Sequence, residues 1–347
     1  MVKLYNKNGY ADMHSIMSLP VPFILCIGGR GTGKTYGAFA EMLDNYQPFI
    51  YLRRTRSQQE LAQQSEFAPL NPVAKDRGEL YTAQAVNNYV GAYYHGEARE
   101  DGKVVPVGAP VGYILSLSTI SNARSFDMSN CKVILYDECI PEKHERRIKN
   151  EPDAILNMYE TINRNRELKG QQPIKMVMLA NANNYDSAVL EAFRLVRTIE
   201  TMHKRGQSVQ LDKRRGIAVV LLQDSPIAAA KSKTALYKVA ASTDFERMAI
   251  GNDFETDAYT DIAPRPLSEY TSLVCCGGMC IYTHKNARDY YVCGHVSGAP
   301  DTYSNTPDGR QAMRRKYYWL WDLYLQHGVV FESVEIKTFF RGVFALG

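Results

Sequence analysis

Apolar runs and segments with helical spacing alternate along the first two thirds of the chain. Short runs rich in β-branched and aromatic residues are typical of strands, and their alternation with helical patterns predicts βαβ units. The fold expected for this part is therefore α/β, with a mostly parallel sheet. Six strands are predicted, at residues 21–27, 48–54, 112–118, 132–138, 174–181 and 216–222.

The segment 225–242 is small and polar and has few large apolar side chains. Such a composition is typical of a boundary between domains. With 347 residues and 45% hydrophobic content, the chain is long enough to bury two cores. We expect an α/β domain at residues 1–224, a linker at 225–242 and a small α+β domain at 243–347.

The pattern after the predicted linker indicates short strands and one long helix. Residues 308–328 have the spacing of an amphipathic helix, and a last strand is expected near residues 333–340. An antiparallel meander is predicted before the helix, with strands at 271–277, 279–284 and 289–295.

Charge is unevenly distributed along the chain. The 41 Lys and Arg exceed the 37 Asp and Glu by four, which permits a polyanionic partner without requiring one. The segment 201–217 alone contains five Lys and Arg against one Asp. Such a cluster can contact phosphates without reading bases, or it can be a solvated rim. The candidate nucleic-acid contacts are its basic residues, Lys204, Arg205, Lys213, Arg214 and Arg215.

Cysteine content and hydropathy bear on the expected compartment. The seven cysteines are an odd number, and residues 1–15 lack the pattern of a signal peptide, which favours a reducing compartment and free thiols. No apolar run approaches the roughly 20 residues of a spanning helix, so no membrane location is expected. The expected setting is a cytoplasm.

The sequence CIGGRGTGKT, residues 26–35, lies between the first predicted strand and a helical pattern. Its spacing fits the P-loop, in which backbone amides surround phosphates, a lysine reaches the β and γ oxygens, and a hydroxyl ligates Mg²⁺. The flanking strand and helix distinguish this motif from a merely structural glycine turn. Arg30 is also a candidate for γ-phosphate contact, and a simply solvated side chain is the alternative. The predicted nucleotide-binding residues are Gly28, Gly29, Arg30, Gly31, Thr32, Gly33, Lys34 and Thr35.

Two adjacent acids end the predicted strand KVILYDE. Asp137 is expected to hold Mg²⁺ through water, and Glu138 to polarise the attacking water. The alternative is a solvated strand exit, which the upstream P-loop disfavours. A second carboxylate at this place is a feature of ATP-hydrolysing motors, so the pair indicates hydrolysis.

Further polar residues follow the predicted strands. Asn181 ends IKMVMLAN, where an amide can distinguish ATP from ADP, although an ordinary turn asparagine also fits. Ring motors complete each site with a cation from the neighbouring subunit. The candidates are Arg124, before the acid-bearing strand, and Arg146 and Arg147, after it; a surface arginine is the competing interpretation for each.

The order of these motifs resembles the genome-packaging ATPases, or encapsidation proteins, of small tailed phages with protein-primed linear double-stranded DNA (Picovirinae and Salasmaviridae). These belong to the additional-strand-catalytic-glutamate class of P-loop ATPases and are related to large terminases. The resemblance covers residues 20–200, through GGRGTGKT, RR, GYILSLSTISNARS, CKVILYDECIPE, ETINRNRE and MLANA. It implies that the Walker A, Walker B and coupling positions are Lys34 and Thr35, Asp137 and Glu138, and Asn181.

The resemblance also implies partners. Members of this family form homopentameric rings at the portal of an empty procapsid and drive DNA inward, so the expected localisation is the host cytoplasm and, transiently, the portal vertex. Arg124 matches a basic residue that acts across the subunit interface. By the same resemblance, Arg146 aligns near the position of the family's trans-acting arginine, and Arg147 fits that position equally well. The sequence leaves open whether a packaging RNA takes part.

The predicted C-terminal domain differs from the nuclease of large terminases. That nuclease is RNase H-like and has an Asp on its first strand for two-metal cleavage. Here the corresponding sequence is SLVCCGGMCIYTH, with Cys and Gly in that place. We therefore expect a vestigial nuclease that only binds nucleic acid. A zinc site is disfavoured because the cysteines and His295 lack paired CxxC spacing.

The function predicted from the sequence is ATP-driven translocation of double-stranded viral DNA, with ATP and Mg²⁺ as cofactors. Two alternatives stay open at this point. One is a large terminase with an active nuclease. The other is a nucleotide-gated structural or adaptor protein without turnover, against which the two adjacent acids argue.

Overall fold

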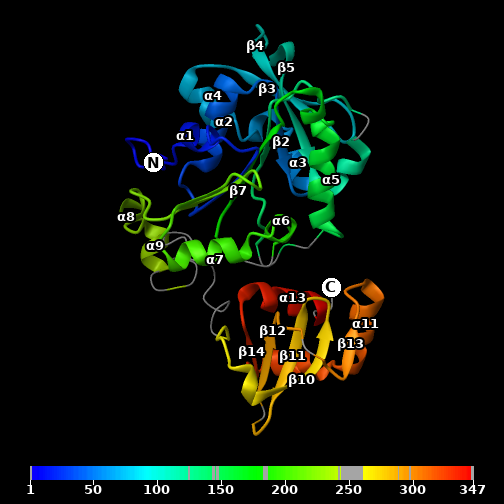
Figure 1. Ribbon diagram of the computed structural model, residues 1–347. Helices are drawn as coiled ribbons and strands as arrows, with labels where there is room; N and C mark the ends of the chain where they lie inside the picture. Colours follow the sequence, from blue (N-terminus) through cyan, green and yellow to red (C-terminus); the bar gives the residue numbers. More distant parts are fainter. Residues whose placement is uncertain are drawn as a thin grey trace. The chain divides into compact units, whose positions relative to one another are not determined.

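The computed structural model describes residues 2–123, 126–142, 145, 148–182, 187–240, 243, 261–287, 289–296 and 298–344. The chain divides into two compact units (Figure 1). The first unit comprises Met1–Phe193 and Thr201–Phe254, and the second comprises Arg194–Glu200 and Glu255–Gly347. The segment predicted as a linker contains two short helices, α8 (Ala228–Lys231) and α9 (Ala235–Val239), and belongs to the first unit.

A nine-stranded sheet forms the centre of the first unit, in the order β3-β4-β5-β2-β6-β7-β1-β9-β8. The strands from β5 to β9 in this order are parallel, and the antiparallel pairs β3–β4, β4–β5 and β8–β9 extend its two edges. This confirms the predicted mostly parallel sheet and all six predicted strands. The strands are Phe23–Gly28 (β1), Phe49–Arg53 (β2), Tyr81–Ala85 (β3), Gly91–Ala98 (β4), Val104–Ser116 (β5), Val133–Tyr136 (β6), Lys175–Ala180 (β7), Val209–Asp212 (β8) and Ile217–Leu222 (β9).

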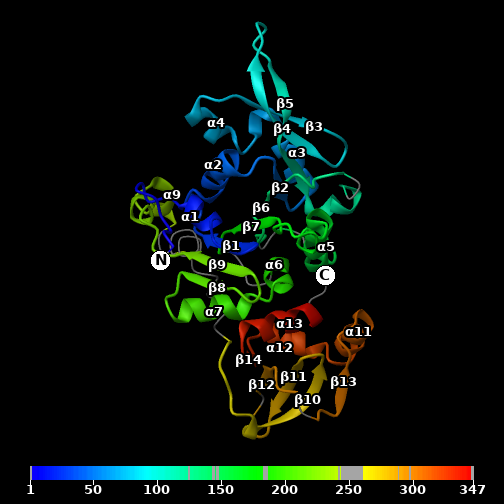
Figure 2. The ribbon, with the colours of Figure 1, turned by 45° about the horizontal axis from the view of Figure 1, so that its top comes forward.

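Helices lie on both sides of this sheet, with α1, α2 and α4 on one side and α5 on the other (Figures 1 and 2). Burial on both faces explains why the central strands are continuous apolar runs, such as FILCIG in β1. None of the helices in the described ranges is long and apolar enough to cross a membrane. The helices up to the start of β8 are Met13–Met17 (α1), Lys34–Asn45 (α2), Arg56–Ala62 (α3), Asn71–Arg77 (α4), Glu151–Asn163 (α5), Ala188–Ala192 (α6) and Val196–Lys204 (α7).

The parallel strands bring several chain segments to one edge of the sheet. Ile27 of β1 pairs with Ala180 of β7, and Leu52 of β2 pairs with Tyr136 of β6. The residues that follow β1, β2, β6 and β7 therefore emerge side by side. Ligands of open α/β sheets bind at this carboxyl edge, and the predicted site residues of three of these segments lie here.

A five-stranded mixed sheet forms the second unit, in the order β13-β10-β11-β12-β14. The neighbours β10, β11 and β12 are antiparallel, which confirms the predicted meander, whereas β13 and β14 are parallel to the strands they join. The unit is thus α+β. Its strands are Tyr270–Cys276 (β10), Met279–His284 (β11), Tyr290–Cys293 (β12), Asp301–Tyr303 (β13) and Val329–Phe331 (β14).

Two predictions for the second unit are wrong in detail. The single helix expected at 308–328 is divided into α11 (Pro307–Lys316) and α12 (Trp319–Leu325). The break lies at Tyr317, which has non-helical φ and ψ angles of −114° and 27° and whose hydroxyl contacts the Asp301 carboxylate.

The strand expected near 333–340 is instead the helix α13 (Val334–Phe344). Its buried apolar residues, Val334, Phe340, Val343 and Phe344, follow a helical period, whereas the short run VEIKTFF suggests the period of a strand. The helix covers the sheet because these residues belong to the same apolar cluster as Val274 and Ile281.

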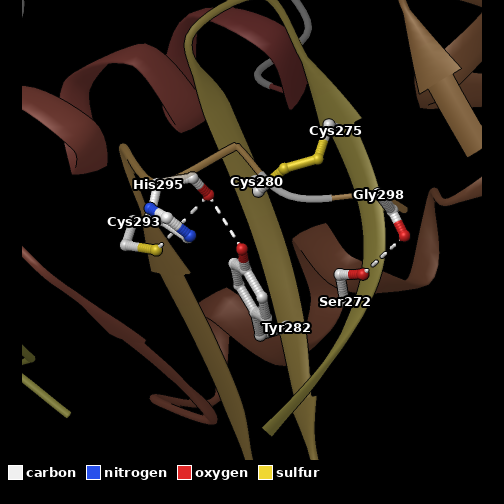
Figure 3. The surroundings of a disulfide bond; sticks show 7 residues. All are labelled: Ser272, Cys275, Cys280, Tyr282, Cys293, His295 and Gly298. Atoms are coloured by element: carbon white, nitrogen blue, oxygen red, sulfur yellow. Dashed lines mark hydrogen bonds between the residues drawn. A yellow bond between two sulfur atoms is a disulfide. The ribbon is translucent and has the colours of Figure 1, made fainter. Parts of the chain in front are cut away.

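The expectation that all cysteines are free thiols is also wrong. Cys275 and Cys280 face each other across the β10–β11 pair, with Cα atoms 4.1 Å apart, and their sulfur atoms form a disulfide (Figure 3). Cys293 belongs to the same apolar cluster, whereas Cys276 lies in the cluster on the other face of the sheet. Three of these cysteines therefore share one face of the sheet and Cys276 lies on the other, as the alternation of strand faces requires.

Candidate active site

The phosphate loop joins the end of β1 to the start of α2 and contains two positions that require glycine. Gly33 has φ of 81° and precedes the first residue of α2, in the left-handed region that glycine adopts without strain. A Cβ on Gly28 would approach the Leu222 side chain of β9 to 2.9 Å. The loop thus lies close to β9, and the N-terminus of the twelve-residue helix α2 opens onto it.

Lys34 is folded back over the loop. Its Nζ donates hydrogen bonds to the carbonyl oxygens of Gly28 and Gly29, at 2.7 and 2.9 Å, and to Oδ1 of Asn181, at 3.2 Å. The residue is only 8% exposed, and its burial lowers the pKa of the ammonium to about 8. A buried cation of this kind is stabilised by an incoming anion.

Thr35 and Asp137 form a pair of hard oxygen donors beside Lys34. The Thr35 hydroxyl lies 3.2 Å from both carboxylate oxygens of Asp137, which also accepts a hydrogen bond from the Tyr51 hydroxyl at 3.1 Å. Asp137 is buried, and the loss of solvent raises the pKa of its carboxyl group. Hydroxyl and carboxylate oxygens are the donors that Mg²⁺ prefers, so these residues fit a divalent cation.

Glu138 follows Asp137 but points to a different partner. Its backbone has φ of 51°, which is uncommon for a non-glycine residue and is found more often at functional sites. Its side chain is 59% exposed, and its Oε2 accepts a hydrogen bond from Arg53 Nη2 at 2.5 Å. The carboxylate therefore lies at the mouth of the site, held by an arginine.

Arg53 and Tyr51 of β2 are site residues that the sequence analysis did not single out. Arg53 Nη1 donates to the Tyr51 hydroxyl at 3.1 Å and lies 3.5 Å from Asp137 Oδ2, while Nη2 bonds Glu138. The signal was present as RR at the end of the second strand. The pair was noted only as part of the family pattern, without a role for either arginine.

Arg54 points away from these acids. It forms a bidentate ion pair with Glu151, at 2.7 and 2.8 Å, and both side chains are almost completely buried. Glu151 is the first residue of α5, so this pair joins the end of β2 to the start of that helix. Neighbouring residues of a strand face opposite ways, which explains the different partners of Arg53 and Arg54.

A pocket of about 320 Å³ unites most of the predicted residues. Asn181 lines it and bonds Lys34, as described above. Arg30 also lines it, but its guanidinium forms an ion pair with Glu142. The remaining predicted residues that line the pocket are Gly31, Thr32, Gly33, Lys34, Thr35, Asp137 and Glu138.

The arginine candidates and the basic run need separate treatment. Arg124, Arg146 and Arg147 lie outside the described residues. The basic run in 201–217 is exposed, but the chain divides it into two clusters. One cluster, Lys204 and Arg205, lies at the end of α7 before β8, and the other occupies the β8–β9 turn: Lys213, Arg214 and Arg215.

These two clusters lie near opposite ends of the parallel strands. Asp212 pairs with Ile217, which in turn pairs with Phe23 at the start of β1, so the turn lies far from the phosphate loop. Arg215 bonds the carbonyl oxygen of Phe193 there. The Lys204–Arg205 cluster precedes Val209, whose partner Val220 is near the carboxyl end of β9, next to the loop.

A glycine-rich loop between a parallel strand and a helix, with two acids after another parallel strand of the same sheet, defines the class of P-loop proteins. The Podovirus DNA encapsidation protein (Gp16) family matches residues 4–295. The chain belongs to this family, which confirms the resemblance seen in the motifs.

Named relatives agree with this assignment. The DNA packaging proteins of Bacillus phages PZA and phi29 are each 27% identical to this chain over 246 residues. In both cases the match covers 69% of this chain and 64% of the relative, so the chain aligns with less than two thirds of their length.

Two solved structures share the fold over nearly the whole chain. One is described as the Phi-28 gp11 DNA packaging motor, with a TM-score of 0.66, 17% identity and coverage of 98% of this chain and 99% of that one. The other is the bacteriophage Phi-29 viral genome packaging motor assembly, with a TM-score of 0.65, 18% identity and 98% of both chains covered.

Proposed function

We propose that this protein is the ATPase of a phage genome-packaging motor, which hydrolyses ATP to drive double-stranded DNA into a preformed procapsid. The observation that carries the proposal is the convergence of Lys34, Asp137 and Glu138 on one pocket at the carboxyl edge of the sheet. Membership of the encapsidation family supports DNA as the load and the procapsid as its destination.

The phosphate loop binds the triphosphate of ATP. Lys34 exchanges the carbonyl oxygens of Gly28 and Gly29 for the β and γ oxygens, which are stronger acceptors because they are charged. The backbone N–H groups of the loop and the N-terminus of α2 complete the cradle. Asn181 already contacts Lys34 and is placed to respond to the γ-phosphate.

Mg²⁺ that accompanies ATP would be held by Thr35 and Asp137 and would neutralise charge on the phosphate oxygens. The short distance between the hydroxyl and the carboxylate and the burial of Asp137 support this assignment. Tyr51 and Arg53 position the carboxylate.

Glu138 orients and polarises the attacking water. In the structure its carboxylate bonds Arg53, so hydrolysis requires that this contact be loosened to let Glu138 face the γ-phosphate. The exchange of the Arg53 guanidinium for a water molecule as the partner of this carboxylate is one way to activate the site. Arg53 is thus a positioning residue for the catalytic glutamate.

The motor is a homo-oligomeric ring, a pentamer by resemblance to the family, with each site completed by an arginine of the neighbouring subunit. The candidates remain Arg124, Arg146 and Arg147. Subunits with Glu138→Gln mixed with subunits with Arg124→Ala or Arg146→Ala should regain activity at mixed interfaces. Activity that follows only the proportion of intact sites would show that these arginines do not act across the interface.

DNA is gripped through its phosphates, by residues of the two basic clusters. Residues 1–224 are the core of the proposed motor domain, and 225–242, whose helices α8 and α9 pack with that unit, is the segment that leads toward the next domain. Residues 243–347 are proposed to form a domain of RNase H-like layout that binds nucleic acid without cutting it. Three antiparallel strands with a parallel neighbour support this layout. The first of them, TSLVCC after Tyr270, contains no acid, which supports loss of cleavage.

The deciding experiment measures phosphate release by the protein alone, with DNA and with empty procapsids. We expect slow release alone and stimulation by DNA and procapsids together. Absence of release under all three conditions would favour a nucleotide-gated adaptor without turnover. Cleavage of plasmid DNA in the presence of Mn²⁺ would instead favour a terminase with an active nuclease. The motor acts in the host cytoplasm, at the portal vertex during packaging, and adding packaging RNA to the same assay tests that partner.

A further inference from the structure

A lysine from outside the P-loop motif contacts the phosphate loop. Lys231, the last residue of α8, donates a hydrogen bond from Nζ to the carbonyl oxygen of Arg30. The same Nζ lies 3.6 Å from the position that a Cβ on Gly31 would occupy. Because Arg30 and Gly31 line the nucleotide pocket, this ammonium lies against its wall.

The N-terminal segment places α8 beside the loop. The backbone N–H of Ala11 donates to the carbonyl oxygen of Thr32, within the loop, at 2.8 Å. The Tyr5 hydroxyl donates to the carbonyl oxygen of Gln223, between β9 and α8, at 2.6 Å. The same segment therefore contacts the loop on one side and the approach to α8 on the other, which limits the positions that Lys231 can reach.

Lys231 also contacts the next helix. Its Nζ lies 5.0 Å from the centroid of the Tyr237 ring, a buried side chain of α9, within the range of a cation–π interaction. The ammonium thus connects the phosphate loop with both α8 and α9. Its charge acts on Lys34 as well, because it is one of the groups that lower the pKa of Lys34, after the dominant effect of burial.

We propose that Lys231 is a second lysine for the γ-phosphate of ATP, and that it holds α8 and α9 against the phosphate loop while that phosphate is present. The proposal rests on the ATPase function proposed above. A phosphate oxygen is a stronger acceptor for an ammonium than a neutral carbonyl oxygen is. The flexible four-carbon stem of lysine lets Nζ move from the Arg30 carbonyl to the phosphate without displacing the helix.

A γ-phosphate ligand and a purely structural lysine differ in whether their contribution to nucleotide binding depends on the third phosphate. A lysine that only fixes the shape of the loop supports ADP and ATP binding equally, since both nucleotides use the loop. A γ-phosphate ligand discriminates between them. Loss of the γ-phosphate also returns Nζ to the weaker carbonyl partner, so α8 and α9 are held more firmly in the ATP state than in the ADP state.

The test compares binding of a non-hydrolysable ATP analogue and of ADP to the full chain. Lys231→Ala should weaken binding of the analogue by about tenfold to a hundredfold, the range for a hydrogen bond to a charged group, and change ADP affinity less than twofold. Lys231→Arg should keep most of the discrimination. The matched control is Lys233→Ala, because Lys233 is exposed two residues away and should leave both affinities unchanged.

Hydrogen exchange of residues 228–239 provides a second measurement. In the wild-type protein the analogue should protect these amides more than ADP does, and Lys231→Ala should abolish the difference. If the wild-type protein binds both nucleotides and Lys231→Ala weakens the binding of the analogue and of ADP equally, or changes neither, the role of Lys231 as a γ-phosphate ligand is overturned. If the wild-type protein bound neither nucleotide, the proposed ATPase function would fail, and this inference with it.

Discussion

The proposed nucleotide binding should depend on pH because Lys34 is buried. The ammonium of the free protein has a pKa of about 8, lowered first by desolvation, and the phosphates of ATP require its charged form. Below pH 8 the group is protonated in both the free and the bound protein. Above pH 8, Lys34 of the free protein loses this proton, whereas Lys34 of the nucleotide-bound protein keeps it because the phosphates stabilise its charge. Binding then takes up a proton, and the affinity for the nucleotide falls as the pH rises.

The pKa sets the size of the effect. The competent form of the free protein is the protonated one, and the apparent dissociation constant increases in inverse proportion to its fraction. With a pKa of about 8 this fraction falls roughly tenfold between pH 7 and pH 9. The dissociation constant should therefore increase about tenfold over this interval, which corresponds to about 1.4 kcal/mol.

Calorimetric titration with a non-hydrolysable ATP analogue at pH 7, 8 and 9 measures the change, and two buffers of different ionisation enthalpy count the proton taken up. Lys34→Arg is the control, because a guanidinium stays charged at these pH values and its affinity should not vary with pH. A dissociation constant that is constant in the wild-type protein would refute the argument. An equal slope in Lys34→Arg would assign the titration to another group.

Three further predictions concern other parts of the first unit. Glu138→Gln should bind ATP but hydrolyse it at least ~10²-fold more slowly, and near-normal phosphate release would contradict its role. Arg54→Met leaves the buried Glu151 carboxylate uncompensated and should lower the free energy of unfolding by about 3–5 kcal/mol. Replacing both Arg54 and Glu151 by Met should recover most of this loss, with the free energy of unfolding measured by chemical denaturation. A loss below about 1 kcal/mol in the single variant would contradict the interpretation of this contact as a buried ion pair. The three cations of the β8–β9 turn are Lys213, Arg214 and Arg215. Replacing all three by Ala should reduce the slope of log DNA affinity against log salt concentration by about two to three units, and an unchanged slope would remove them from the DNA path.

The predicted site residues that the structure brings together in one pocket are those for which one short motif carries both the proposed chemistry and its position. The P-loop includes its own strand and helix, and the Asp137–Glu138 pair ends a run that is recognisably a strand. Parallel strands then bring these ends together without any further information. Asn181 is placed by the same rule, one strand away, and the structure shows its contact with Lys34.

Residues whose role depends on which way a side chain points are harder to predict. The RR pair at the end of β2 indicates that the two arginines face opposite ways, but not that Arg53 meets Glu138 and Arg54 meets Glu151. Lys231 is 201 residues from Arg30, in a segment that composition alone indicates as a linker. Contacts this remote depend on the packing of the N-terminal segment, for which the sequence gives no local signal.

Periodicity also fails where a segment is short or carries a single break. The run VEIKTFF is too brief to separate the two periods, and α13 became evident only from the side chains it buries. In the helical pattern of 308–328, the contact between Tyr317 and Asp301 stabilises a break. The sequence has no proline or glycine at this point that would predict the break. In both cases tertiary contacts decide between local alternatives that are close in energy.

The two basic clusters differ in how directly they are connected to the nucleotide. The end of β9 pairs with Gly28 at the start of the phosphate loop, and Gln223 follows it. The Gln223 side chain bonds the imidazole of His203 at 3.2 Å, and His203 precedes Lys204 at the end of α7. A short route therefore joins the loop and the approach to α8 with Lys204 and Arg205. Among the residues that the structure describes, no comparable route starts from the cations of the β8–β9 turn, because these cations lie at the amino ends of the parallel strands. DNA contacts that change with the nucleotide are thus expected at Lys204 and Arg205, whereas contacts at the turn would hold DNA equally in both states.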